Sequence, residues 1–116
     1  MTLVVADDDP DIRRVLARWA GRFGLECVAV ESADSLLRAL DSCRPQALIC
    51  DVNLAEADGI ALCRILAARH PGLAIVMMTG DPGEVPRARA AGFAEVLQKP
   101  FDLALVEPAL RRLLPG

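Results

Sequence analysis

The stretch Ala47-Leu48-Ile49-Cys50-Asp51-Val52-Asn53 decides the fold of this chain. Four apolar residues run directly into Asp51, and a short β-prone run that stops at a carboxylate is typical of a buried strand with a charge at its tip. Other apolar runs recur along the chain, and segments with helical spacing of apolar residues separate them. We therefore predict alternating strands and helices, with Asp51 at the carboxyl end of the third strand.

The composition indicates one compact domain. The 116 residues are 53% hydrophobic and 25% charged, which leaves no room for a linker or a second core. The net charge of −3, from 13 basic and 16 acidic side chains, offers no basic field for nucleic acid. No apolar run approaches the length of a membrane span, and the first residues lead straight into a strand. We therefore expect neither a nucleic-acid nor a membrane partner.

The four cysteines point to a reducing compartment. No two of them have C-x-x-C spacing, and Cys27, Cys50 and Cys63 lie inside apolar segments. Free buried thiols are favoured over disulfides or metal ligands, and such thiols are typical of the cytoplasm. The sequence therefore predicts a cytoplasmic protein.

Apolar periodicity predicts five strands and five helices. The strands are expected at residues 3–6, 26–30, 47–51, 74–78 and 95–98, and the helices at 10–23, 33–44, 59–69, near 87–91 and from 103 onwards. The first helix is expected to turn Ile12, Val15, Leu16, Trp19 and Phe23 inward, and the third to bury Leu62, Ile65 and Leu66. Right-handed crossovers between parallel strands place helices on both faces of the sheet. The fold class is therefore a single-domain α/β three-layer sandwich, for which we expect the strand order 2-1-3-4-5.

Polar side chains follow four of the predicted strands: Asp7 and Asp8, then Asp51, Thr79 and Lys99. Because the carboxyl ends of parallel strands meet at one edge of a sheet, these side chains are expected to lie together. Three neighbouring carboxylates repel one another unless a cation neutralises them. A ligand set of oxygen atoms alone suits Mg²⁺. Lys99 then supplies a positive charge, and Thr79 a hydroxyl, for phosphate oxygens.

Asp51 is the predicted nucleophile of this site. An ionised carboxylate needs no general base, which agrees with the absence of a recognisable Ser, Cys or His triad. In-line attack on a phosphoryl group gives an acyl phosphate, while Mg²⁺ and Lys99 offset the charge on the transferred group. Water reverses such a modification. The sequence therefore predicts a phosphoacceptor switch and not a high-turnover enzyme.

These motifs, taken together and in order, resemble the receiver domain of two-component response regulators, the CheY-like phosphoproteins of bacterial phosphorelay signal transduction. The motifs are Asp7-Asp8, Asp51 with Asp58-Gly59 downstream, Thr79-Gly80 and Lys99-Pro100-Phe101, and the resemblance covers residues 1–116. It implies a flavodoxin-like (βα)5 fold and phosphorylation of Asp51 by a sensor histidine kinase or a phosphotransfer protein. It also implies that Thr79 and Lys99 bind the phosphoryl group.

The same resemblance implies how the metal is held. Asp8 and Asp51 would bind Mg²⁺ directly, Asp7 through water and Asn53 through its backbone carbonyl. We expect a monomer or weak homodimer that acts on a downstream protein target not identified by the sequence, with no output domain in this chain.

The chain departs from the family pattern at several positions. Val96 stands where an aromatic ring is usual, and Ala55 replaces a usual proline, which is expected to loosen the loop after Asp51. Pro82 and Pro86 predict a brief or displaced fourth helix. Pro108 falls inside the predicted last helix and indicates a kink or a later start. By the resemblance, all of these positions except Ala55 fall on the surface that family members commonly use for dimerisation or output, which leaves the route of signal output open.

Two other functions remain open at this point. A phosphohydrolase of the haloacid-dehalogenase type would use Asp7 as nucleophile with Asp9 as its partner, but Asp11 stands where that pattern has Thr or Val, and no cap domain fits. A receiver used as a phosphorylation-independent interaction domain is prompted by Val96 and by the unusual fourth and fifth helices. Taken singly, Asp7, Asp8 and Asp9 also fit a helix-capping turn. Lys99 alone fits a solvated loop lysine, and four arginines of the first helix fit a solvated face: Arg13, Arg14, Arg18 and Arg22.

Overall fold

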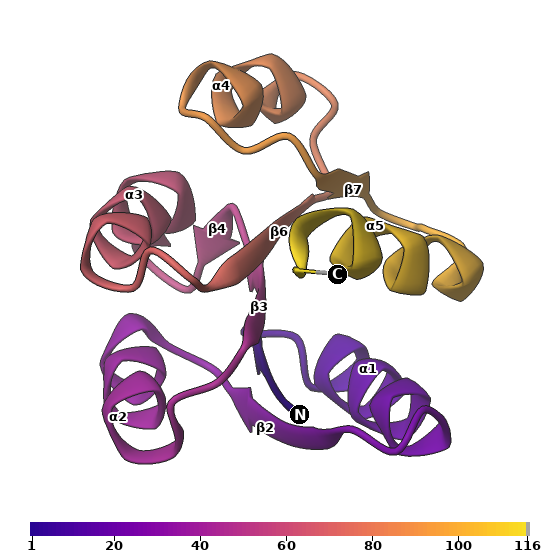
Figure 1. The fold of residues 1–116 in the computed structure, drawn as a ribbon. Coiled ribbons are helices and arrows are strands. Elements are labelled where there is room, and N and C mark those ends of the chain that lie inside the picture. The colour runs from indigo at the N-terminus through magenta and orange to yellow at the C-terminus, as the bar shows by residue number, and fades with distance from the viewer. Residues whose placement is uncertain (116) are drawn as a thin grey trace.

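The chain folds around one parallel sheet, seen here in a computed structural model that describes residues 1–115 (Figure 1). The five strands lie in the order β2-β1-β3-β6-β7 and all neighbouring pairs are parallel. Their bounds are β1 Thr2–Ala6, β2 Glu26–Val30, β3 Ala47–Asp51, β6 Ala74–Thr79 and β7 Val96–Gln98. Counted along the chain, this is the predicted order 2-1-3-4-5, and the strand order reverses between β1 and β3.

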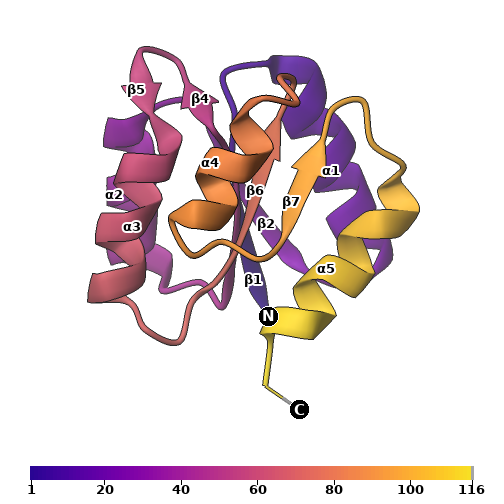
Figure 2. The ribbon, with the colours of Figure 1, turned by 90° about the horizontal axis from the view of Figure 1, so that it is seen from above.

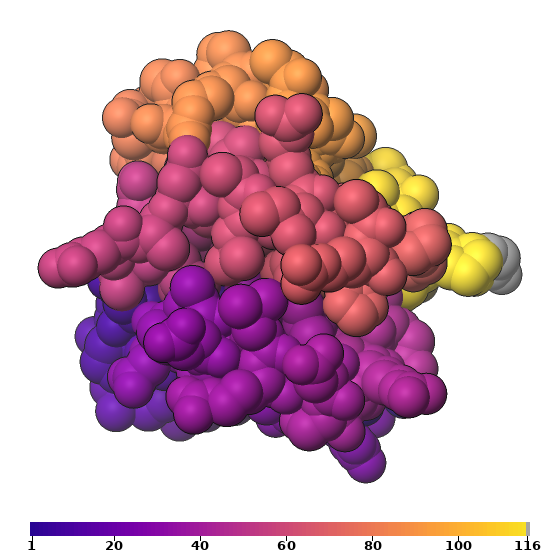
Figure 3. Space-filling view, turned by 90° about the vertical axis from the view of Figure 1, so that its left-hand side faces the viewer, coloured from indigo at the N-terminus to yellow at the C-terminus, as the bar shows by residue number. Residues whose placement is uncertain are grey.

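Helices cover both faces of the sheet. Helices α1 (Pro10–Arg22) and α5 (Val106–Leu113) lie on one face, and α2 (Ala33–Cys43), α3 (Gly59–Arg69) and α4 (Glu84–Ala90) lie on the other (Figures 1 and 2). The second group forms a continuous surface in which α2 and α3 pack side by side (Figure 3). The predicted three-layer α/β sandwich is confirmed.

Alternate side chains of each strand pack into two separate hydrophobic cores, one on each face of the sheet. Val4, Leu48 and Cys50 point to the α2, α3 and α4 side, whereas Val5 and Ile49 point to the α1 and α5 side, and all five side chains are fully buried. A strand buried on both faces needs apolar residues at every position. This is why the β3 sequence is an unbroken apolar run up to Asp51.

Two predicted helix faces are partly wrong. Leu16, Trp19 and Ala20 form the buried stripe of α1, but Val15 is 44% exposed and Phe23, just beyond the helix, is 54% exposed. In α3 the buried residues include Ile60, Cys63 and Leu66, whereas Ile65 is 50% exposed. Neighbouring helical positions differ by about 100° around the axis, so a residue adjacent to a buried one can still face water.

The prolines mark helix starts. A short 3₁₀ turn (η1, Leu103–Leu105) precedes α5, which begins at Val106, so Pro108 lies in its first turn. Pro86 likewise lies in the first turn of α4, which spans only seven residues and begins three residues before the predicted Arg87. Backbone N–H groups of a first turn have no partner within the helix, so proline costs little there. The later start of α5 and the brief α4 are confirmed.

The segment after β3 is a hairpin, where the sequence predicts a loop. Strands β4 (Asn53–Leu54) and β5 (Ala57–Asp58) pair in antiparallel fashion around a two-residue turn. Ala55 occupies the first turn position with φ of +53°. Proline, whose ring fixes φ near −65°, cannot adopt this conformation. The change from the usual proline therefore accompanies a defined turn of different backbone geometry.

Two further expectations concern compartment and membrane. All four cysteines are free thiols, with Cys50 and Cys63 buried and Cys27 and Cys43 half-buried. Among the helices within residues 1–115, none combines the length and the apolar character needed to cross a membrane.

Candidate functional site

The site lies at the carboxyl edge of the sheet, where backbone hydrogen bonds continue past the strand ends. The N–H of Asp7 donates to the carbonyl oxygen of Val30 at 3.1 Å, and the N–H of Lys99 donates to that of Thr79 at 2.7 Å. After Asp51, the N–H of Val52 donates to the carbonyl oxygen of Met78 at 2.8 Å. The residues that carry the functional side chains are thus fixed by the sheet.

Three predicted site residues form an acidic cluster. Carboxylate oxygens of Asp7, Asp8 and Asp51 all lie within 4.8 Å of one another. Asp7 is fully buried and Asp51 is nearly so, whereas Asp8 is exposed. Backbone N–H groups two residues on hold two of the carboxylates, from Asp9 to Oδ1 of Asp7 at 2.9 Å and from Asn53 to Oδ1 of Asp51 at 3.1 Å. This set of oxygen atoms can hold a metal ion.

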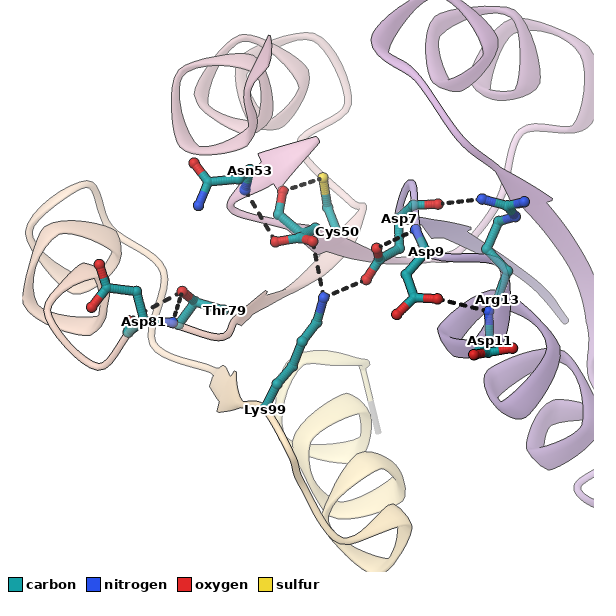
Figure 4. A network of polar contacts seen from close by, with 10 residues as sticks. Asp7, Asp9, Asp11, Arg13, Cys50, Asn53, Thr79, Asp81 and Lys99 are labelled. Atoms are coloured by element: carbon teal, nitrogen blue, oxygen red, sulfur yellow. Dashed lines mark hydrogen bonds and ion pairs between the residues drawn. The ribbon is translucent and has the colours of Figure 1, made fainter. Parts of the chain in front are cut away.

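Lys99 joins two of these carboxylates. Its Nζ atom lies 2.6 Å from Oδ2 of Asp7 and 2.9 Å from Oδ2 of Asp51 (Figure 4). The side chain crosses from the end of β7 to the ends of β1 and β3, and the peptide bond from Lys99 to Pro100 is cis. One ammonium group therefore offsets the repulsion between Asp7 and Asp51.

The electrostatics of the cluster follow from burial and charge. Burial raises the pKa of Asp51 above its ordinary value, although the Lys99 ammonium and the Asn53 N–H act in the opposite sense. Burial lowers the pKa of Lys99, but its hydrogen bonds to Asp7 and Asp51 more than offset this, so that its pKa is raised. The site thus disfavours a negative charge on Asp51 and favours a cation beside it.

Thr79 lies at the same edge but its hydroxyl is turned toward Asp81. The hydroxyl donates to the carbonyl oxygen of Asp81 at 3.1 Å and accepts from its N–H at 3.0 Å (Figure 4). The carboxylate of Asp81 in turn accepts from the N–H of Gly83 at 2.9 Å, just before α4. Of the five predicted side chains, Thr79 alone is engaged away from the cluster.

The Asp58-Gly59 motif holds α3 against the backbone of Asp51. A Cβ atom on Gly59 would lie 2.0 Å from the carbonyl oxygen of Asp51, so only glycine allows this approach. Asp58 caps the helix by accepting from the N–H groups of Ile60 and Ala61 at 3.0 and 3.3 Å. Its carboxylate also pairs with Arg87 of α4, which holds the pKa of Asp58 below its ordinary value.

Sequence reasoning missed Arg13, which the helical pattern places on a solvated face. Its Nη1 atom donates to the carbonyl oxygen of Asp7 at 2.8 Å, and its side chain is 21% exposed (Figure 4). Helical side chains lean toward the helix N-terminus, and Arg13 is the fourth residue of α1. The position of Arg13 in the first turn of the helix could therefore have indicated a contact with the preceding loop.

An apolar groove of about 240 Å³ lies at the other end of the molecule. It runs between α1 and α5 near Trp19, Phe23 and Leu110, and also borders Leu25, which precedes β2. It contains no member of the acidic cluster, so the chemistry of the chain is concentrated at the carboxyl edge of the sheet.

Fold and site together define a class of phosphoacceptor switch, and comparison with known proteins agrees. Residues 3–111 match the family model described as the response regulator receiver domain. The chain belongs to this family of two-component response regulator receivers.

Similar proteins are known from several bacteria. The DNA-binding transcriptional regulator NtrC of Proteus hauseri is 38% identical over 112 residues, which cover 91% of this chain and 24% of that protein. The transcriptional regulatory protein FixJ of Azorhizobium caulinodans is 35% identical, with 95% of this chain and 53% of that protein covered. The solved receiver domain of NtrX from Brucella abortus is 31% identical, has a TM-score of 0.82 and covers 96% of this chain and 98% of its own. The chain spans about a quarter of the NtrC relative and about half of FixJ.

Proposed function

We propose that Asp51 is the phosphoacceptor of this receiver and that Mg²⁺ is required for the transfer. The observation that carries this proposal is the position of Lys99, whose ammonium lies between the carboxylates of Asp51 and Asp7 within the acidic cluster. Three carboxylates against one ammonium leave the cluster with an excess of negative charge, which favours a bound cation, and the ammonium is the group that can attract phosphoryl oxygens. The donor is a sensor histidine kinase or a phosphotransfer protein, in keeping with the family.

Access to solvent selects Asp51 over Asp7 as the nucleophile. The Asp51 side chain is 10% exposed, whereas that of Asp7 is fully buried. In the reaction an Asp51 carboxylate oxygen forms a bond to phosphorus, the bond from phosphorus to the donor nitrogen breaks, and its electron pair stays with the donor. A buried Asp7 also weighs against the phosphohydrolase alternative, which requires Asp7 as nucleophile.

The residues present fit a magnesium ion. Carboxylate oxygens of Asp7, Asp8 and Asp51 lie within 4.8 Å of one another, and no histidine or cysteine is among the cluster. Asp8 and Asp51 would bind the ion directly and Asp7 through water, as the resemblance implies. Asn53 follows Asp51 closely enough to add its backbone carbonyl, as the resemblance implies. When bound, the ion offsets negative charge on the phosphoryl oxygens.

Two side chains are proposed to hold the phosphoryl group. The Lys99 ammonium already lies 2.9 Å from Oδ2 of Asp51 and can shift to a phosphoryl oxygen on that carboxylate. The Thr79 hydroxyl must first give up its hydrogen bond to the carbonyl of Asp81. Phosphorylation is therefore linked to the turn between β6 and α4, and this link is a route to changed partner binding.

The domain is proposed to be a switch with no turnover beyond its own phosphorylation and dephosphorylation. Its downstream partner is a protein, and we propose a monomer or weak homodimer in the cytoplasm. The DNA-binding function in the name of NtrC belongs to a protein of which this chain spans about a quarter.

Intact-mass analysis after incubation with acetyl phosphate and Mg²⁺ tests the proposal. We expect the gain of one phosphoryl group, lost in Asp51→Asn and in a sample treated with a chelator. Asp11→Asn is a matched control, because Asp11 lies on the exposed surface of α1, outside the cluster. No mass gain under any condition, or a gain that survives Asp51→Asn, would overturn it.

A second candidate is an interaction domain that works without phosphorylation. It is favoured by Val96, which has no ring to reorient, and by the engagement of the Thr79 hydroxyl with the Asp81 backbone. This candidate predicts that beryllofluoride binds without changing the backbone amide spectrum or the oligomeric state. Shifts that spread from Thr79 into α4 on binding would exclude it.

A further inference from the structure

Arg13 connects three segments around the acidic cluster. It projects from α1 and donates from Nη1 to the carbonyl oxygen of Asp7 at 2.8 Å, and its Nη2 atom lies 3.9 Å from Oε2 of Glu31, which follows β2. The same two loops are joined by the backbone hydrogen bond from the N–H of Asp7 to the carbonyl oxygen of Val30. The guanidinium thus lies at the junction of α1 with the ends of β1 and β2, and its contact with Asp7 is seen in Figure 4.

The side chain of Arg13 is much more buried than that of the next residue in the helix, Arg14. The Arg13 side chain is 21% exposed, whereas that of Arg14 is 70% exposed and pairs with the likewise exposed Asp11 on the helix surface. A partly buried, charge-assisted hydrogen bond to a carbonyl is stronger and better oriented than an exposed ion pair. Arg13 therefore holds its acceptor in place in a way that Arg14 does not.

The carbonyl that Arg13 holds belongs to the peptide group between Asp7 and Asp8. Fixing this peptide plane sets the direction in which the side chains of both acids leave the backbone. The carboxylate of Asp7 is further held by Lys99 and the N–H of Asp9, but that of Asp8 is exposed. The orientation of Asp8 therefore depends on its backbone, which is held on one side by the hydrogen bond from the Asp7 N–H to Val30 and on the other by Arg13.

We infer that Arg13 is a positioning residue for the divalent-cation site and that it favours Mg²⁺ over Ca²⁺. This inference rests on the magnesium site of the proposed function. Mg²⁺ demands near-ideal octahedral geometry, whereas Ca²⁺ accepts variable geometry and longer bonds. A residue that fixes ligand orientation hence matters more for the smaller ion. Its effect is opposite to that of its charge, since a guanidinium near the acids repels either cation.

The test measures the affinities of the purified chain for MgCl₂ and CaCl₂ by isothermal titration calorimetry. The variants are Arg13→Gln, Arg13→Lys and the matched control Arg14→Gln. We expect both Arg13 variants to bind Mg²⁺ about tenfold more weakly, as is typical for loss of an outer-shell contact, with a smaller change for Ca²⁺. Arg14→Gln is expected to keep the wild-type ratio of the two affinities. Arg13→Lys retains the charge. If Arg13→Gln does not fold, the affinities of Arg13→Lys are compared with those of the wild type instead.

The remaining outcomes overturn the inference. Suppose that Arg13→Gln binds both cations more tightly and that Arg13→Lys behaves as the wild type. Arg13 would then affect the site only through its positive charge, and not by positioning the ligands. An unchanged ratio of Mg²⁺ to Ca²⁺ affinity in both variants would mean that Arg13 has no role in the choice between the two ions. A wild-type chain that binds neither cation would overturn the metal site as well, whereas wild-type Mg²⁺ binding with unaffected Arg13 variants would overturn this inference alone.

Discussion

Lys99 and Asp51 are 48 residues apart in the chain, yet Nζ of the first lies 2.9 Å from Oδ2 of the second. The contact bridges the ends of β7 and β3, which do not pair with each other because β6 lies between them. A long, flexible side chain spans that distance and also reaches Asp7. The charge balance of the site therefore depends on one residue that directly follows the last strand, β7.

Replacing Lys99 by methionine should destabilise the metal-free domain. The substitution leaves the buried Asp7 carboxylate and Asp51 without their shared cation, at a cost of about 2 kcal/mol in the free energy of unfolding at pH 7. Mg²⁺ should recover part of this loss, because it supplies positive charge at the same place. Urea unfolding with and without Mg²⁺ measures both effects. Arg14→Met, which breaks an exposed pair, is the control, and an equal loss in the two variants would contradict the prediction.

The pH dependence of stability should carry the signature of Asp51. Its pKa is raised in the folded state, so between the ordinary value and the raised value the folded chain binds more protons than the unfolded chain. The contribution of Asp51 to stability therefore improves as pH falls through the folded pKa. We compare the free energy of unfolding of the metal-free wild type with that of Asp51→Asn. As pH is lowered from neutral to about 4, the wild type should gain stability relative to the variant. A difference that is flat or of opposite slope would refute this.

Gly59→Ala should disturb the site through the backbone. The new methyl group would lie 2.0 Å from the carbonyl oxygen of Asp51 and 2.8 Å from that of Val52, so α3 must move. We expect a loss of about 3 kcal/mol in the free energy of unfolding and slower phosphorylation. Gly21→Ala in α1 is the matched control, since its Cβ meets nothing within 4 Å. That control should gain about 0.5 to 1 kcal/mol from helix propensity, and similar effects at the two sites would contradict the steric argument.

The hairpin after β3 should distinguish glycine from proline at Ala55. With φ of +53°, Ala55 carries left-handed strain that glycine removes, whereas proline cannot adopt this conformation. Thermal unfolding should show Ala55→Gly at or above the wild-type midpoint and Ala55→Pro below it. Ala57→Gly, within β5, is the control and should be destabilising. A proline variant as stable as the wild type would mean that the turn readily adopts another geometry.

Much of the site was predictable because buried strands, and the polar residues that end them, can be recognised from short stretches of sequence. A strand buried on both faces requires an unbroken apolar run, and the polar residue that ends it must lie at the sheet edge. The apolar runs alone therefore assign five polar residues to one edge of the sheet: Asp7, Asp8, Asp51, Thr79 and Lys99. Pro108 likewise indicated the later start of α5, and Pro82 and Pro86 the brief α4, since proline is accommodated in a first turn but not in a helix interior.

The features that escaped prediction depend on contacts between segments. The buried faces of α1 and α3 are set by how each helix rotates against the sheet, which left Val15 and Ile65 in water. Ala55 in the hairpin turn has a left-handed backbone conformation. Glycine is the usual sequence signal for such a turn, and this position does not carry it.

The sequence by itself determined the order of strands and helices and which residues end the strands, because hydrophobic period and turn chemistry are local properties. Only the tertiary structure decided that Arg13 turns from the solvent to the carbonyl of Asp7 and that the Thr79 hydroxyl pairs with Asp81. Hydrogen-bond partners are chosen by the position of backbone groups in space, and those positions exist only once the sheet has brought its strand ends together.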